Sequence, residues 1–217
     1  HQDLHSFPTR RSSDLNLVLS VIGASLLWVG WFGFNAGSEL AADGLAGAAM
    51  MNTQVATAAA GLAWMFTEWM AAKKPSVLGI ISGAVAGLVA VTPASGFVNP
   101  TGAFVIGIVA GILCYFAAVK MKHAFGYDDS LDAFGVHGVG GIIGALLTGV
   151  FADVAINPAG KDHSIFTQAY GIVFTIVWTA VVSLVILYAL KATIGLRPST
   201  QEEVEGLDVT QHGEVVP

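Results

Sequence analysis

Long apolar runs separated by short polar breaks are the feature that most constrains the fold of this chain. A helix that crosses the hydrocarbon core of a bilayer needs about 20 predominantly apolar residues. Beginning at Leu17, six runs of roughly this kind follow one another, and the third stops at Thr92-Pro93, where helix is disfavoured. We therefore predict an all-α, polytopic membrane protein with six transmembrane helices, at 17–37, 45–72, 77–91, 103–119, 134–151 and 165–190.

Composition supports this class and argues against others. Only 11% of the residues are charged and 54% are hydrophobic, whereas about a quarter of a soluble domain is charged. The net charge of -6 reflects an acidic last segment, and no basic patch suggests a nucleic-acid partner. The single cysteine, Cys114, lies in an apolar run, so we expect a packed, inert thiol.

Three regions differ in composition. Residues 1–15 do not match the rest, begin without Met and lack the apolar core of a signal peptide, so we expect a non-native, disordered leader and a natural chain that extends further upstream. Residues 16–195 form the predicted transmembrane domain. Residues 196–217 form an acidic tail whose composition is typical of a solvated segment.

Lysine and arginine predict the orientation, because short cytoplasmic loops are enriched in them. The breaks after the second, fourth and sixth runs carry nearly all of these residues, and the other breaks carry only Lys161. The C-terminus is therefore expected in the cytoplasm. The outer loop after the first run carries Glu39 and Asp43, which favour the approach of a cation.

His137 is an ionisable residue inside the fifth run. Such residues are costly in a membrane and usually mark a path for ions or protons. A hydrogen-bonded core histidine is the alternative, and the nearby Gly140 and Gly144 have the spacing of close helix packing. His137 is therefore a candidate pore residue.

Four residues of the first run share one helix face. Leu27, Trp31, Phe34 and Ser38 recur at i, i+4, i+7 and i+11. Ring faces and a hydroxyl at the outer, acidic end can attract a cation, each interaction contributing about 1 kcal/mol or more when desolvated. Packing, or anchoring of Trp at the membrane interface, is the alternative.

These motifs resemble the ammonium transporter (Amt/Mep/Rh) family, most closely its bacterial members. The resemblance begins near residue 16 and covers the rest of the chain. It implies spans six to eleven of an eleven-span protein: the second inverted repeat and the final helix. It rests on Gly30–Ser38, Asn52-Thr53, Lys74–Ser76, Ala86–Ala94, Asp128-Asp129, Asp132–Gly138 and Glu205–Glu214.

The resemblance also implies residue roles. Ser38 matches the outer recruitment site, Phe34 the phenylalanine gate, and Trp31 and Leu27 the pore wall. His137 matches one of the family's twin histidines, whose partner belongs to the first repeat. Ammonium would be recruited outside and deprotonated, and ammonia would then cross a hydrophobic pore in which a neutral imidazole accepts a hydrogen bond or a proton.

Further expectations concern partners and alternatives. Asp132 is expected to be a structural first-turn carboxylate, with a vestibule role as the alternative. The resemblance implies a homotrimer in the plasma membrane and a PII-type nitrogen regulator at the cytoplasmic tail. The sequence has no catalytic constellation and no metal or cofactor motif, so an enzyme is not expected. An ammonium sensor on the same fold and an inactive truncated fragment are the alternative functions.

Overall fold

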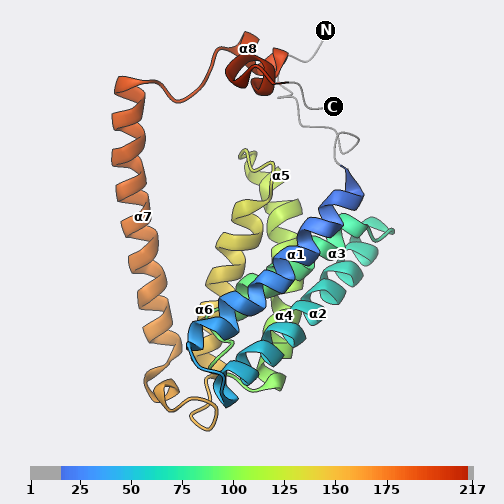
Figure 1. Ribbon diagram of the computed structural model, residues 1–217, viewed down its shortest axis with the longest axis vertical. Coiled ribbons are helices and arrows are strands. Elements are labelled where there is room, and N and C mark those ends of the chain that lie inside the picture. The colour runs from blue at the N-terminus through green and yellow to red at the C-terminus, as the bar shows by residue number, and fades with distance from the viewer. Residues whose placement is uncertain (1–15, 215–217) are drawn as a thin grey trace. The chain divides into compact units, whose positions relative to one another are not determined.

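The computed structural model describes residues 16–214, which contain helices and loops and no strand. The chain divides into two compact units with their boundary between Ile172 and Val173. The first unit contains α1 to α6 and the start of α7, and the second contains the rest of α7 and α8 (Figure 1). The predicted leader lies outside the described residues, and the predicted domain boundaries remain predictions.

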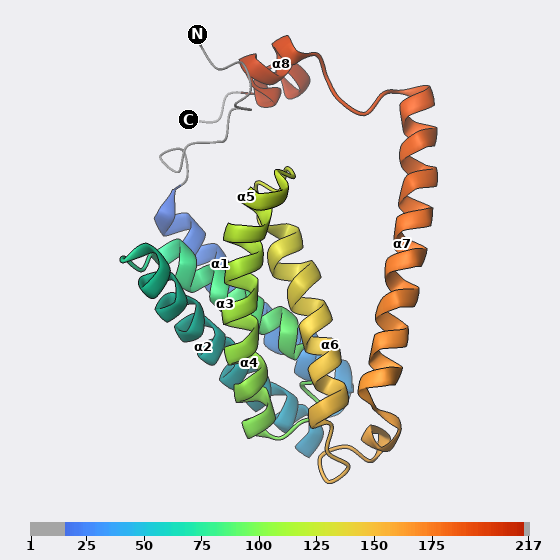
Figure 2. The same cartoon turned by 180° about the vertical axis from the view of Figure 1, so that it is seen from behind.

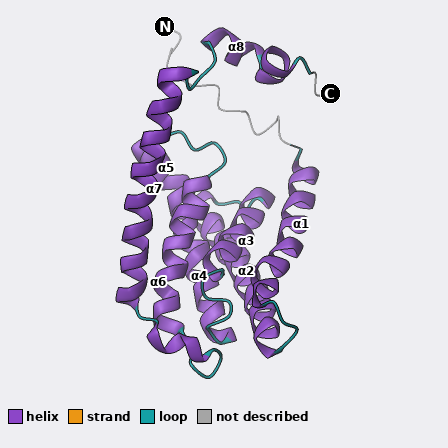
Figure 3. Cartoon of the chain, turned by 60° about the vertical axis from the view of Figure 1, so that its left-hand side comes forward, coloured by secondary structure: helices purple, strands orange, loops and turns teal. Residues whose placement is uncertain are grey.

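Each predicted span corresponds to helical structure, as the helix colouring of Figure 3 makes visible. Two π-helical segments also occur: Phe116–Met121 joins α4 to α5, and Phe134–Gly138 leads directly into α6. The α-helices are α1 (Leu17–Ala36), α2 (Gly44–Ala72), α3 (Val77–Val91), α4 (Pro100–Tyr115), α5 (Lys122–Phe125), α6 (Val139–Phe151), α7 (Ile165–Thr193) and α8 (Thr200–Glu205).

Four helical stretches in the described part of the chain are long and apolar enough to cross a membrane by themselves. The helix α3 is shorter, at 15 residues, and α2 carries polar side chains, including Asn52 and Thr57, that are buried inside the unit. The qualifying stretches are Leu17–Glu39, Pro100–Phe125, Phe134–Phe151 and Ile165–Thr193.

Polar residues in the breaks fix where the helices begin. Asp43 Oδ1 accepts hydrogen bonds from the backbone of Leu45 and Ala46 at 3.0 Å each, which caps α2. Asn99 Oδ1 accepts one from Gly102 N at 3.0 Å, and Pro100 occupies the first turn of α4, where its missing N–H does no harm. The polar breaks therefore separate the spans and also satisfy backbone groups at helix ends.

The helix α2 packs most extensively against α3 and α4, and small residues allow this contact (Figure 2). A Cβ atom on Gly107 of α4 would lie 2.3 Å from Ala56 O of α2, and one on Gly111 would lie 2.4 Å from Ala60 O. No larger residue fits at such a separation. Membrane helices use small residues in this way because van der Waals packing contributes strongly to their association.

The glycines near His137 also face neighbouring helices. A Cβ atom on Gly144 would lie 2.1 Å from Ala90 O of α3, whereas one on Gly140 would lie 3.4 Å from Cys114 Sγ, close to ordinary contact. Close helix packing is thus confirmed at Gly144. Cys114 is fully buried among apolar residues, as expected of a packed thiol.

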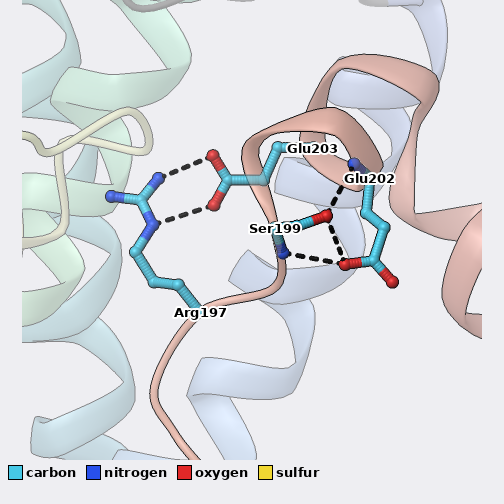
Figure 4. A network of polar contacts seen from close by, with 4 residues as sticks. All are labelled: Arg197, Ser199, Glu202 and Glu203. Carbon is cyan, nitrogen blue, oxygen red and sulfur yellow. Dashed lines mark hydrogen bonds and ion pairs between the residues drawn. The ribbon is translucent and has the colours of Figure 1, made fainter.

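The described part of the tail in the second unit forms short helical turns, and most of its residues are exposed. Arg197 donates from Nε and Nη2 to the two carboxylate oxygens of Glu203 at 2.8 and 3.0 Å. Ser199 and Glu202 form a reciprocal capping box at the start of α8 (Figure 4). After Gly206, residues Asp208–His212 form a further π-helical turn.

Glu202 connects the two parts of this tail. Its carboxylate accepts hydrogen bonds from Ser199 Oγ at 2.7 Å, Ser199 N at 2.8 Å and Gln211 Nε2 at 3.0 Å. The hydrogen bonds from the Ser199 side chain and backbone lower the pKa of Glu202 below its ordinary value. Local hydrogen bonds, which composition does not reveal, therefore order the tail.

Candidate functional site

The aromatic face predicted on α1 is internally connected. The rings of Trp31 and Phe34 meet edge to face, with centroids 5.7 Å apart. Ser38 lies in the 3₁₀ turn that follows the helix, and its hydroxyl donates to the carbonyl oxygen of Phe34 at 2.5 Å. Trp31, Phe34 and Ser38 therefore occupy consecutive turns and restrict one another's positions.

Trp31 is also fixed from outside its own helix. Its indole Nε1 donates to Thr92 Oγ1 at 2.8 Å, and that hydroxyl donates to Leu88 O of α3 at 2.7 Å. The hydroxyl of Thr92 thus acts as acceptor and donor at once. This pair of bonds ties the aromatic face of α1 to the end of α3.

Two buried asparagines connect the surrounding helices and the turn between α3 and α4. Asn35 Nδ2 of α1 donates to Thr53 Oγ1 of α2 at 2.9 Å. Asn52 Nδ2 donates to Ser95 O at 2.8 Å and to Val98 O at 2.6 Å, which anchors the turn between α3 and α4. Buried hydrogen bonds of this kind are costly to break, so they set the shape of this end of the unit.

A pocket of about 250 Å³ opens where these elements meet. It contains two aromatic side chains, Phe34 and Phe97, and the hydroxyl groups of three residues. Among the described residues that line it, Glu39 is the only ionisable one. The lining residues are Phe34, Asn35, Ser38, Glu39, Leu45, Ala49, Thr92, Ser95, Gly96, Phe97 and Asn157.

This lining suits a small cation that donates hydrogen bonds. Ser38 donates its only hydroxyl proton to Phe34 O, so its remaining capacity is as an acceptor. The carboxylate of Glu39 is an acceptor when ionised, and the faces of Phe34 and Phe97 attract positive charge. Acceptors, ring faces and a negative charge therefore gather at one place without a basic residue in the lining.

His137 does not line this pocket. It lies in the π-helical turn Phe134–Gly138, whose residues Gly135 and Val136 are buried, while the His137 side chain is exposed. A Cβ atom on Gly135 would lie 2.8 Å from Ala118 Cα, so this side of the turn packs closely on the Phe116–Met121 segment. Single π-helical turns are frequent at functional sites.

Leu27 likewise lies outside the pocket and is 44% exposed, and Phe34 is 62% exposed although it lines the pocket. The structure therefore brings Trp31, Phe34 and Ser38 together and does not enclose Leu27 or His137 with them. Of the predicted pore residues, Leu27, Phe34 and His137 are exposed, whereas Trp31 is half-buried.

Asp132 does not act as the first-turn carboxylate that the sequence predicts. Its side chain forms an ion pair with Lys122, and its backbone φ is 55°, in the left-handed region. Asp129 performs the capping role, since its two carboxylate oxygens accept from Ala133 N at 2.8 Å and Phe134 N at 2.9 Å. Asp132 is structural in a different way: with Lys122 it closes the loop after α5.

Phe97, Thr92 and Asn157 are pocket residues that the sequence reasoning missed. Thr92 and Phe97 belong to the turn between α3 and α4, and Asn157 belongs to the loop after α6. Phe97 O accepts a hydrogen bond from Asp153 N at 2.7 Å, which joins this turn to that loop. Only the Thr92-Pro93 break carried a signal, because it marked a helix end on the side predicted to be outer. The hydrogen bond between Thr92 and Trp31 could not be predicted from the spacing of these residues in the sequence.

The sequence relatives agree with the motifs. The model of the Ammonium Transporter Family matches residues 7–216. An ammonium transporter of Aquifex aeolicus is 53% identical over 204 residues, covering 92% of this chain and 48% of that protein. One from Bacillus subtilis is 46% identical over 210 residues, covering 94% and 52%. The chain spans about half the length of the curated relatives it matches.

Solved structures give the same result. A protein described as a Sensor Amt Protein matches with a TM-score of 0.83 and 33% identity, covering 90% of this chain and 49% of that one. Saccharomyces cerevisiae Mep2 matches with a TM-score of 0.80 and 36% identity, covering 86% and 44%. With its apolar helices, its matching motifs and these relatives, the chain belongs to the ammonium transporter family and is a multi-pass membrane protein.

Proposed function

We propose that this chain forms part of a transmembrane ammonium transporter and that its pocket receives ammonium. The observation that carries the proposal is the junction of Trp31, Phe34 and Ser38 beside Glu39, a set of acceptors and ring faces with one negative charge. Ammonium resembles potassium in charge and size but has N–H donors, which such acceptors recognise.

The remaining candidate residues support a path for ammonia. In the proposed mechanism, ammonium loses its water near Phe34, and neutral ammonia passes Trp31 and Leu27 toward His137. The proton that ammonium gives up either returns to the outer water or is relayed through the neutral imidazole of His137, which can also accept an N–H bond from ammonia. Since the relatives are about twice as long, we propose that the rest of a full-length protein covers these exposed side chains and supplies the second histidine.

Orientation and assembly follow from the same proposal. The pocket lies at the end of the first unit predicted to be outer, and Lys73, Lys74 and Lys122 occupy the breaks predicted to be cytoplasmic. We propose a plasma-membrane protein with a cytoplasmic C-terminus that assembles as a homotrimer. The folded tail supports a docking site for a PII-type regulator, and equal recovery of the regulator with and without residues 196–217 would count against it.

An ammonium sensor is the second candidate function. The likeness to the Sensor Amt Protein favours it, because the same pocket could bind ammonium without appreciable flux. A sensor and a transporter would bind ammonium in the pocket in the same way. They would differ only in whether ammonia passes beyond Phe34.

Reconstitution separates the two functions. A full-length protein that carries this sequence is placed in liposomes, and ammonium is added outside while current and internal pH are recorded. A transporter gives an ammonium-dependent signal. A correctly assembled protein that binds ammonium and gives no signal is a sensor, and a protein that neither binds nor transports ammonium overturns both candidates.

A further inference from the structure

Phe97, one aromatic wall of the pocket, rests against a histidine that the sequence gave no reason to single out. The ring centroids of Phe97 and His163 are 4.5 Å apart, with planes inclined by 47°. His163 lies in the loop between α6 and α7, and its backbone N–H donates to Gly160 O at 3.1 Å. Phe97 also lines the pocket together with Phe34 and Ser38.

The contact is reinforced by the backbone. Asp153 N donates to Phe97 O at 2.7 Å, so the loop that carries His163 holds Phe97 both through its main chain and through a ring. The side chain of His163 is half-buried, and its Nδ1 is buried and forms no hydrogen bond with any described residue. No hydrogen bond at Nδ1 therefore fixes the imidazole, and the Phe97 ring is its one aromatic neighbour among residues 16–214.

We propose that His163 is a positioning residue for the ammonium pocket: it holds Phe97 in place when neutral and weakens ammonium capture when protonated. This inference rests on the proposed function. A neutral imidazole supports the ring that offers its face to a cation. A protonated imidazole places a positive charge beside that ring, which opposes the entry of a second cation.

Three charged side chains lie in the same loop as His163: Asp153, Lys161 and Asp162. The turn 92–99, Ser164 and the first residues of α7, 165–169, contain no titratable side chain. Glu39 contributes a carboxylate to the pocket lining. Histidine is the side chain whose ordinary pKa, about 6.5, lies in the physiological range.

The test uses a full-length protein that carries this sequence, with ammonium transport measured between about pH 7.5 and pH 5.5 on the outside. Ammonium itself stays protonated over this range, so its concentration is constant. The wild type should show a KM that rises roughly threefold to tenfold on acidification while kcat changes little. His163→Phe keeps a ring against Phe97 without titrating, so its KM should stay low and independent of pH. His163→Ala should raise KM at every pH.

A matched control is His123→Phe, because His123 is an exposed histidine of α5, on the loop predicted to be cytoplasmic. This variant should keep the pH dependence of the wild type. If His163→Phe keeps it too, the titrating group is elsewhere and the inference is wrong. A low, unchanged KM in His163→Ala would also overturn the positioning role.

Binding separates this inference from the proposed function. Ammonium titrated into purified protein by calorimetry gives a Kd that needs no flux, so the same variants can be compared in a sensor. Absence of ammonium binding by the wild type at high pH contradicts the proposed function and the inference resting on it. Binding with a Kd that ignores both pH and His163 contradicts only the inference. An NMR shift of the His163 ring that is unchanged by Phe97→Leu also contradicts the contact on which the inference depends.

Discussion

Trp31 and Thr92 are 61 residues apart in the sequence, and the indole Nε1 of Trp31 donates to Thr92 Oγ1 at 2.8 Å. This bond sets the direction of the indole, and the indole in turn contacts Phe34 edge to face. The Thr92-Pro93 break that ends α3 therefore also positions the aromatic face of α1. The pocket depends on a contact between the first and third helices.

Replacing Thr92 by Val tests this dependence. The substitution keeps the shape of the side chain and removes the acceptor, so the part-buried indole N–H loses its partner at a cost of about 1–3 kcal/mol. We expect lower thermal stability and a raised KM for ammonium in the full-length protein. Thr92→Ser, which retains the hydroxyl, is the control and should stay close to the wild type in both measurements.

Gly144 should tolerate no side chain. In Gly144→Ala the new Cβ atom would lie 2.1 Å from Ala90 O, so α6 has to move away from α3, at a cost of about 1–3 kcal/mol. The matched control is Gly141→Ala on the same helix, where nothing lies within 4 Å of the added atom. Thermal unfolding in detergent compares them, and equal stability of the two variants would show that this close approach is not maintained.

The start of the π-helical turn that carries His137 should depend on Asp129. Asp129→Ala removes the acceptors for Ala133 N and Phe134 N, and loss of such a cap typically costs about 1 kcal/mol. Hydrogen exchange at residues 133–138 should therefore become faster. Asp128→Ala, which removes the neighbouring carboxylate, serves as the control, and equal exchange in both variants would argue against the cap.

The folded tail should depend on pH through Glu202. Since its pKa is lowered in the folded state, the stabilisation is present above the ordinary pKa of a glutamate, about 4.3, and is lost as the pH falls through the lower folded value. Hydrogen exchange at residues 199–212 should accelerate in that acidic window. In Glu202→Gln the exchange should already be faster near neutral pH and depend less on pH. An identical pH profile in wild type and variant would exclude this role.

The sequence predicted the helices well because hydropathy acts along the chain. The bounds of α3 agree with the predicted run, and α6 with its preceding π-helical turn covers the predicted 134–151. Trp31, Phe34 and Ser38 were also found together, since helical spacing places them on one face. Each of these inferences used only residues that are close together in the sequence.

Contacts between distant segments could not be predicted in this way. Phe97 and His163 meet through two loops, and nothing in their spacing indicates the contact. The sequence could not show that Asp129, and not Asp132, caps the start of the π-helical turn. Asp132 has a left-handed backbone with a φ of 55°, which spacing does not predict. In the tail, composition gave no indication of the hydrogen bonds to Glu202 that stabilise its helical turns.

The central claim is that ammonium is captured at Ser38, whose oxygen is left as an acceptor by its bond to Phe34 O. The direct measurement is the KM for ammonium of Ser38→Ala in a full-length protein that carries this sequence. Ser25→Ala is the matched control, because Ser25 lies on α1, which precedes the turn of Ser38, and donates in the same way to a carbonyl oxygen four residues earlier, Val21 O, at 2.8 Å.

Loss of one hydrogen bond to a charged group costs about 1.5–3 kcal/mol, so the account predicts that Ser38→Ala raises KM by at least roughly tenfold while Ser25→Ala leaves it unchanged. Equal KM values for wild type and both variants would contradict the account.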